Sequence, residues 1–161
     1  MREAELTYQL DQAHVLIHTG QADEALRLLN AANQDYQDMM AEFGAATRYR
    51  FHRLRALAYL HLAEPASARQ ELNAALRDVD DLFRDSISEA CFIDRSGSEV
   101  ARMVRRNRAA VADLSPDESR NPFFTPTFNL KPGQVYQSAP YLSMDTNEWV
   151  VGNATPLEVG G

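Results

Sequence analysis

The chain has 161 residues, of which 45% are hydrophobic and 24% charged, and its formal net charge is −7. This composition is that of a globular protein rather than a disordered one, and the length fits one ordinary domain or two small ones. A net acidic chain is a poor candidate for non-specific nucleic-acid binding, which depends on positive charge facing phosphates. We therefore expect no nucleic-acid partner.

Cysteine usage and hydropathy exclude further classes of protein. Cys91 is the only cysteine, so neither an intrachain disulfide nor a zinc site built from cysteines can form, although a single cysteine does not fix the compartment. No apolar run approaches the ~20 residues of a membrane helix. The first residues also lack the apolar core of a signal peptide.

The first half of the chain predicts four helices. Apolar residues recur at helical spacing in four stretches between residues 4 and 84, beginning with Leu6, Leu10, Ala13 and Ile17. Gly20 suits a helix C-terminus, Gly44 interrupts the pattern, and Pro65 suits the first turn of a fourth helix. The short loops favour antiparallel neighbours.

Two stretches of the helical half look like copies of one another. Residues 16–32 resemble residues 59–75 at a shift of 43 residues, which aligns Gly20 with Ala63 and Ala25 with Ala68. The pattern resembles two tetratricopeptide-like helical hairpins, with longer helices than the usual repeat of ~34 residues. A plain four-helix bundle accounts for the same pattern equally well.

The hydrophobic period changes near residue 86 to one that is typical of strands. Residues 87–94 and 99–104 predict a hairpin around the turn Asp94-Arg-Ser-Gly97. Residues 106–122 suggest one short helix, and residues 122–132 an ordered loop. Residues 133–140 and 148–156 predict two further strands, with residues 144–147 as their turn. The expected fold is α+β, with a helical domain at 1–84 and an antiparallel sheet domain at 85–161.

Three segments of the second half, in this order, resemble the Cache (PAS-like) sensor domains of bacterial receptors, in particular the double-Cache type. The first is residues 87–102, with an Asp-x-x-Gly turn and a Glu-Val-x-Arg return strand. The second is Asn121-Pro-Phe-Phe124, and the third is residues 135–141 together with residues 145–156. The resemblance covers residues 83–157. It departs from the family because no closing strand and no second module follow Thr155-Pro156, and because the leader helices are short.

The resemblance implies a function in signalling. The expected protein is an extracytoplasmic input module of a membrane-anchored receptor, of the diguanylate cyclase, histidine kinase or chemoreceptor type. It would bind a small polar organic molecule, such as an amino acid, an organic acid or an amine. Because the sheet would end without its closing strand, an unpaired strand edge favours a homodimer.

Five residues are candidates for ligand contact. Tyr136, Tyr141 and Trp149 combine an apolar body with a polar tip and can line a pocket. Strand alternation, however, predicts that Tyr136 and Tyr141, five residues apart, face opposite sides. Arg120 could pair with a ligand carboxylate, and Asp145 could accept a ligand amine.

The remaining chemistry is sparse. The sequence has none of the nucleophile-elbow, phosphate-loop or dinucleotide-binding motifs, so we expect no enzyme activity and no cofactor. His14 and His18 have a spacing that can hold a metal, but without a third ligand at motif spacing no metal site is expected. The alternative function is a tetratricopeptide-like interaction scaffold, with a peptide groove formed by Tyr8, His14, Arg48, Arg53 and Tyr59.

Overall fold

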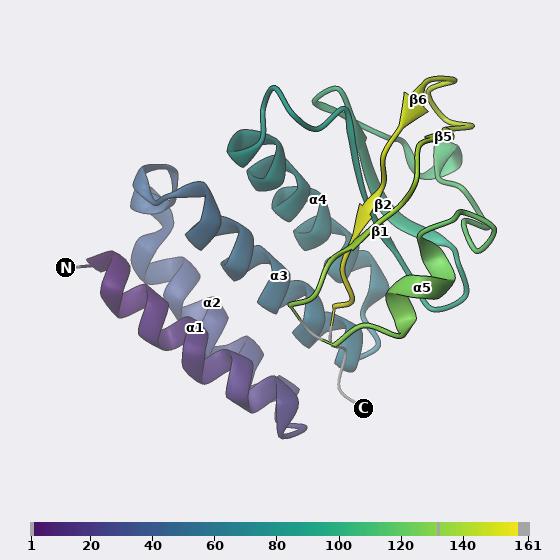
Figure 1. The fold of residues 1–161 in the computed structure, drawn as a ribbon. Coiled ribbons are helices and arrows are strands. Elements are labelled where there is room, and N and C mark those ends of the chain that lie inside the picture. Colours follow the sequence, from purple (N-terminus) through teal and green to yellow (C-terminus); the bar gives the residue numbers. More distant parts are fainter. Residues whose placement is uncertain (1, 132, 158–161) are drawn as a thin grey trace. The chain divides into compact units, whose positions relative to one another are not determined.

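The computed structural model describes residues 2–131 and 133–157 (Figure 1). Five α-helices and short antiparallel strands confirm the α+β class, with helices first and strands after them. The chain forms two compact units. The helical unit contains residues 2–92 and 100–114, and the second unit contains residues 93–99 and 115–157.

The four predicted helices are confirmed. They are α1 (Arg2–His18), α2 (Ala22–Tyr36), α3 (Ala45–His61) and α4 (Pro65–Leu82), and a 3-10 helix at Gln37–Glu42 joins α2 to α3. The apolar stripes of α1, α2 and α3 meet in one core, which includes the fully buried side chains of Leu6, Leu10, Leu29, Phe51 and Leu54. Burial of these stripes, rather than helix propensity, supplies most of the stability of such helices.

The turns that close the two helical hairpins have the same geometry. After α1, Gln21 N–H donates to Leu16 O at 2.8 Å and Gly20 N–H donates to Ile17 O at 3.1 Å. After α3, the bonds from Glu64 to Tyr59 and from Ala63 to Leu60 repeat these distances at a shift of 43 residues. Gly20 and Ala63 both have positive φ, +79° and +58°. The repeat seen in the sequence therefore corresponds to a repeated turn.

A second hydrophobic core joins strands to helices inside the helical unit. Strands β1 (Glu89–Ile93), β2 (Glu99–Val104) and β3 (Asn107–Arg108) form a sheet in that order. Ala101 and Met103 of β2 pack with Ala56, Leu72 and Leu76 of α3 and α4. Most of β1 and β2 therefore belongs to the same compact unit as the helices. A domain division after residue 84 stays a prediction.

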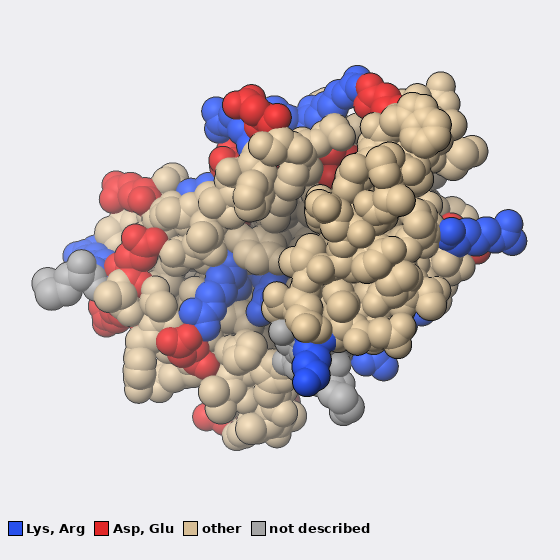
Figure 2. All heavy atoms as spheres, viewed as in Figure 1, with Lys and Arg blue, Asp and Glu red and all other residues tan. Residues whose placement is uncertain are grey.

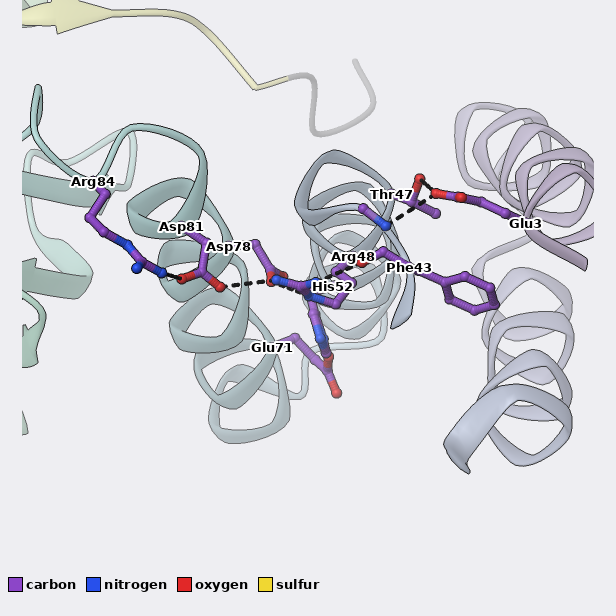
Figure 3. A network of polar contacts seen from close by, with 10 residues as sticks. Glu3, Phe43, Thr47, Arg48, His52, Glu71, Asp78, Asp81 and Arg84 are labelled. Carbon is purple, nitrogen blue, oxygen red and sulfur yellow. Dashed lines mark hydrogen bonds and ion pairs between the residues drawn. The ribbon is translucent and has the colours of Figure 1, made fainter. Parts of the chain in front are cut away.

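Ion pairs connect α3 to α4, and a hydrogen bond connects α3 to the loop before it (Figure 3). Arg48 contacts Asp78 at 2.7 Å and Asp81 at 3.0 Å, and it also donates to Phe43 O at 2.7 Å. Burial raises the pKa of Asp78 despite the hydrogen bond from Arg48. The guanidinium thus holds a buried carboxylate and a loop carbonyl, which fixes α3 against α4.

The predicted turn at residues 94–97 is confirmed, and the Asp94 side chain holds it in place within the second unit. Asp94 Oδ1 accepts hydrogen bonds from Ser96 N–H at 2.8 Å and Ser98 N–H at 3.1 Å. Burial alone would raise the pKa of Asp94, but these bonds and the Ser96 hydroxyl outweigh it and lower the pKa. Gly97 has a φ of +94°, and a Cβ there would lie 3.0 Å from Ser119. Both facts require glycine at this position.

Residues 106–128 differ from the prediction in detail. Where residues 106–122 suggested a helix, the structure has β3 followed by a 3-10 turn at Val111–Asp113. The region predicted as an ordered loop contains the short helix α5 (Phe124–Phe128). It starts after Pro122, and its first turn is closed by a bond from Thr127 N–H to Phe123 O at 3.1 Å.

The last part of the second unit is one interrupted hairpin. Strand β4 (Tyr136–Gln137) pairs with β7 (Asn153–Ala154), and β5 (Tyr141–Leu142) pairs with β6 (Trp149–Val150), both antiparallel. The predicted turn at 144–147 is confirmed by a bond from Ser143 N–H to Glu148 O at 2.9 Å. Asn147 adopts a φ of +54° there, a conformation that asparagine tolerates.

Candidate functional site

The registers of the two strand pairs in the hairpin differ by one residue. In the first pair, Tyr136 lies opposite Ala154 and Gln137 opposite Asn153. Ser138 continues this register, because its N–H donates to Gly152 O at 2.9 Å.

In the second pair, Tyr141 lies opposite Val150 and Leu142 opposite Trp149. Ala139 and Pro140 on one strand therefore stand opposite the single residue Val151 on the other. This two-against-one arrangement is a β-bulge, and it inserts one extra residue into the strand that carries both tyrosines.

The bulge places Tyr136 and Tyr141 on the same face of the hairpin. On the uninterrupted strand, Val150, Gly152 and Ala154 share one side by simple alternation. Their partners across the hairpin are Tyr141, Ser138 and Tyr136, respectively. We call these six residues the aromatic face. Each of them is half-buried or buried. The prediction that the two tyrosines face opposite sides is therefore wrong, because it did not include the extra residue.

Trp149 lies on the other face. Its cross-strand partner is Leu142, and Val151 lies two residues further along on the same side. These side chains are exposed, Trp149 by 75%, Leu142 by 43% and Val151 by 45%. Because adjacent strand residues point to opposite sides, the structure does not bring Trp149 together with Tyr141 or Tyr136 on one face.

Phe123 covers part of the aromatic face. A Cβ built on Gly152 would lie 3.0 Å from Phe123 Cδ1, 3.4 Å from Tyr141 Cε1 and 3.5 Å from Ser138 Oγ. The rings of Phe123 and Tyr141 have centroids 6.1 Å apart and are tilted by 54°, within the range of favourable aromatic pairs. The absence of a side chain at Gly152 is what allows both rings to approach the strand.

Ser138 supplies a buried polar group at this point. Its side chain is 5% exposed, and its Oγ accepts a hydrogen bond from Gly152 N–H at 2.9 Å. The hydroxyl thereby replaces a backbone acceptor next to the bulge. Because the hydroxyl oxygen accepts this bond, its own proton can be donated to a ligand.

Arg120 and Asp145 lie in exposed segments. Arg120 follows a turn in which hydrogen bonds from Ser119 hold the pKa of Asp117 below its ordinary value, and the Arg120 guanidinium acts in the same direction. The Asp145 carboxylate lies within 4.8 Å of the carboxylate of Glu99, which is 6% exposed. Arg120 therefore has an acidic neighbour, Asp117, and the Asp145 carboxylate lies near that of Glu99.

Two hollows of the helical unit are lined by other residues. One is a cavity of about 10 Å³ beside the ion pair of Asp80 and Arg106, room for a single water. The other is an open groove of about 540 Å³ along α1 and α2, lined by Val15, Leu16, Leu28 and their polar neighbours. None of the five predicted ligand residues lines either hollow.

The sequence did not predict Ser138 and Gly152, which belong to the aromatic face, or Phe123, which covers part of it, as site residues. Signals for them exist. A proline inside a strand, here Pro140, is confined to edges and bulges, and a glycine inside a strand marks a close approach of another group. Together they could have indicated the bulge and the ring seated beside it.

Charge is distributed unevenly over the visible surface. In Figure 2, acidic and basic side chains are interspersed over the helices, whereas few charged side chains lie over α5 and the hairpin strands.

Among the helices that the structure describes, none combines the length and the apolar character needed to cross a bilayer. Comparisons with protein-family models, curated proteins and solved structures found no match to this chain.

Proposed function

We propose that the chain is a ligand-sensing input module of a bacterial transmembrane signalling protein, and that it binds a small polar organic molecule at the aromatic face. The observation that supports this most directly is the β-bulge, which aligns Tyr136, Ser138 and Tyr141 on one side of a strand pair. An apolar surface with a few polar groups pointing the same way is the usual chemistry of a small-molecule site.

The aromatic face offers suitable groups for such a ligand. The tyrosine rings provide flat apolar surface and their hydroxyls can donate or accept hydrogen bonds. Ser138 adds a buried hydroxyl next to them. Arg120 and Asp145 remain candidates for pairing with a carboxylate and an amine of the ligand. Trp149, on the opposite face, is better suited to contact with another protein surface.

The wider setting of the module comes from the resemblance to Cache domains. The parent protein would be anchored in the membrane, with this module on the extracytoplasmic side and an output domain of the cyclase, kinase or chemoreceptor type. The module would not be an enzyme and would act as a monomer or homodimer. A ligand that shifts the hairpin relative to α5 could bias the equilibrium between two states of the second unit.

A thermal-shift screen of the full chain tests the proposal. The probes are amino acids, organic acids, amines and nucleosides, because binding to the folded state raises the melting temperature by mass action. Tyr136→Ala and Tyr141→Ala should each weaken binding of the best probe at least ten-fold. Trp149→Ala is the matched aromatic control and should leave binding unchanged. A clean unfolding transition without any shift, or a loss of binding in Trp149→Ala alone, would refute the proposal.

The second candidate function is a peptide-binding scaffold, which is favoured by the repeated helix-hairpin turns at Gly20 and Ala63. Of its five groove residues, Arg48 is engaged in ion pairs with Asp78 and Asp81, whereas Tyr8 is 63% exposed. Selection of peptides from a displayed library separates the two functions. A scaffold would yield peptides whose binding is lost in Tyr8→Ala and retained in Tyr141→Ala.

A further inference from the structure

The aromatic face is partly filled by a ring of the chain itself. Phe123 approaches the bare backbone of Gly152 so closely that even a methyl group there would be crowded, and it pairs with the Tyr141 ring. A flat ring is thus the shape that this part of the face accommodates. The backbone of Gly152 and the ring of Tyr141 form the site that the Phe123 ring occupies, which we call its seat.

Phe123 is held differently from the phenylalanines of the helical core. Phe51 is fully buried in the middle of α3, whereas Phe123 is half-buried and precedes the five-residue helix α5. Pro122, on its N-terminal side, is exposed. Moving a half-buried ring from a loop exposes less apolar surface than moving a core ring, so this seat can be vacated more readily than one in the core.

We propose that the ligand of the aromatic face carries a planar aromatic ring, which takes the seat of Phe123 between Gly152 and Tyr141. This inference rests on the proposed function and adds the chemical class of the ligand. The ring of the ligand would pair with Tyr141 as Phe123 does, and its polar part would reach the hydroxyl groups of Ser138 and Tyr136. An aliphatic ligand of the same charge would lose the ring pairing.

The seated side chain also sets the apparent affinity. A ligand that binds only when the seat is empty has its affinity reduced by the fraction of molecules in that state. If Phe123 occupies the seat about nine-tenths of the time, its removal should tighten ligand binding about ten-fold. A residue that forms part of the wall of the site would have the opposite effect, because its removal would weaken binding.

The test uses pairs of probes that differ only in the ring: phenylalanine with leucine, phenylacetate with hexanoate, and phenethylamine with hexylamine. Binding to the full chain is measured by calorimetry for the wild type, Phe123→Ala and the control Phe128→Ala, whose ring is 53% exposed and pairs with Phe124. We expect the aromatic member of one pair to bind at least ten-fold tighter than its partner. Phe123→Ala should tighten this binding about ten-fold further, and Phe128→Ala should not change it.

A second measurement follows the ring directly and does not depend on the alanine variant. The protein is labelled with 4-fluorophenylalanine, and the ¹⁹F resonance of residue 123 is assigned by its loss in Phe123→Leu. Addition of the aromatic probe should move this resonance towards the position of an exposed ring, while the other resonances change less. An unmoved resonance with bound probe would overturn the inference.

The outcomes separate the two proposals. Equal binding of aromatic and aliphatic probes, or weaker binding in Phe123→Ala, would overturn the ring inference while the proposed sensing function stands. If the wild type binds no probe of any class, the proposed function fails and the inference fails with it.

Discussion

The two helix-hairpin turns provide a reciprocal pair of substitutions. Ala63 adopts a φ of +58°, a left-handed conformation that costs a residue with a Cβ roughly 1–2 kcal/mol. Glycine removes this cost but gains freedom in the unfolded chain that costs about 0.4–1 kcal/mol. Because Ala63 is exposed, its methyl group buries little surface. We therefore expect Ala63→Gly to increase the free energy of unfolding by about 1 kcal/mol, the difference between these two effects.

Gly20→Ala should have the opposite effect of about the same size. A Cβ at Gly20 would meet no atom within 4 Å, so the change measures backbone strain alone. Urea unfolding of the full chain, followed by circular dichroism at helical wavelengths, measures both. Ala31→Gly, at an exposed position inside α2, is the control and should cost about 1 kcal/mol. If Ala63→Gly destabilises the protein as much as Ala31→Gly does, the reasoning from the shared turn is refuted.

Three further substitutions test other parts of the structure. Gly97→Ala should destabilise the second unit by about 2–4 kcal/mol, through its positive φ and the crowding against Ser119, as measured by denaturant unfolding. Because the pKa of Asp94 is lowered in the fold, its contribution is present above the ordinary pKa near 3.8 and is lost as the pH falls through the folded value. Asp94→Asn should therefore flatten the loss of stability below pH 4 in acid titrations. Arg48→Ala should cost about 3–5 kcal/mol at pH 7, because it leaves the Asp78 carboxylate buried without its cation. Protonation of Asp78 should reduce this cost as the pH falls, and a pH-independent cost would contradict the assignment.

The helical half could be predicted from sequence because its signals are local. The apolar spacing that begins at Leu6 and Leu10 identifies each buried face, and Gly20 and Pro65 mark where helices end and begin. The packing of Ala101 and Met103 of β2 with α3 and α4 could not be predicted in this way. It depends on contacts between residues 25 to 47 positions apart in the sequence, which a local hydrophobic period does not predict.

In the second half of the chain, one extra strand residue that the sequence pattern did not predict changes which side chains form the candidate site. The turns at residues 94–97 and 144–147 were predicted correctly, because Asp, Asn and Gly favour the backbone conformations found in turns. The faces of the strands depend on register, and a shift of one residue reverses every assignment beyond it. The bulge at Ala139–Pro140 is such a shift.

The bulge also determines which aromatic residues can act together. Without it, Tyr136 and Ser138 would still share a face with Gly152, but Tyr141 would lie on the other face, so the strand would present one tyrosine to each side. With it, both tyrosines and Ser138 lie on the side where Gly152 leaves room for a ring. Trp149 is excluded from this side by the same register, since its partner Leu142 follows Tyr141 directly. The register of the hairpin therefore determines the composition of the candidate site, and Pro140 is the residue in the sequence that indicates it.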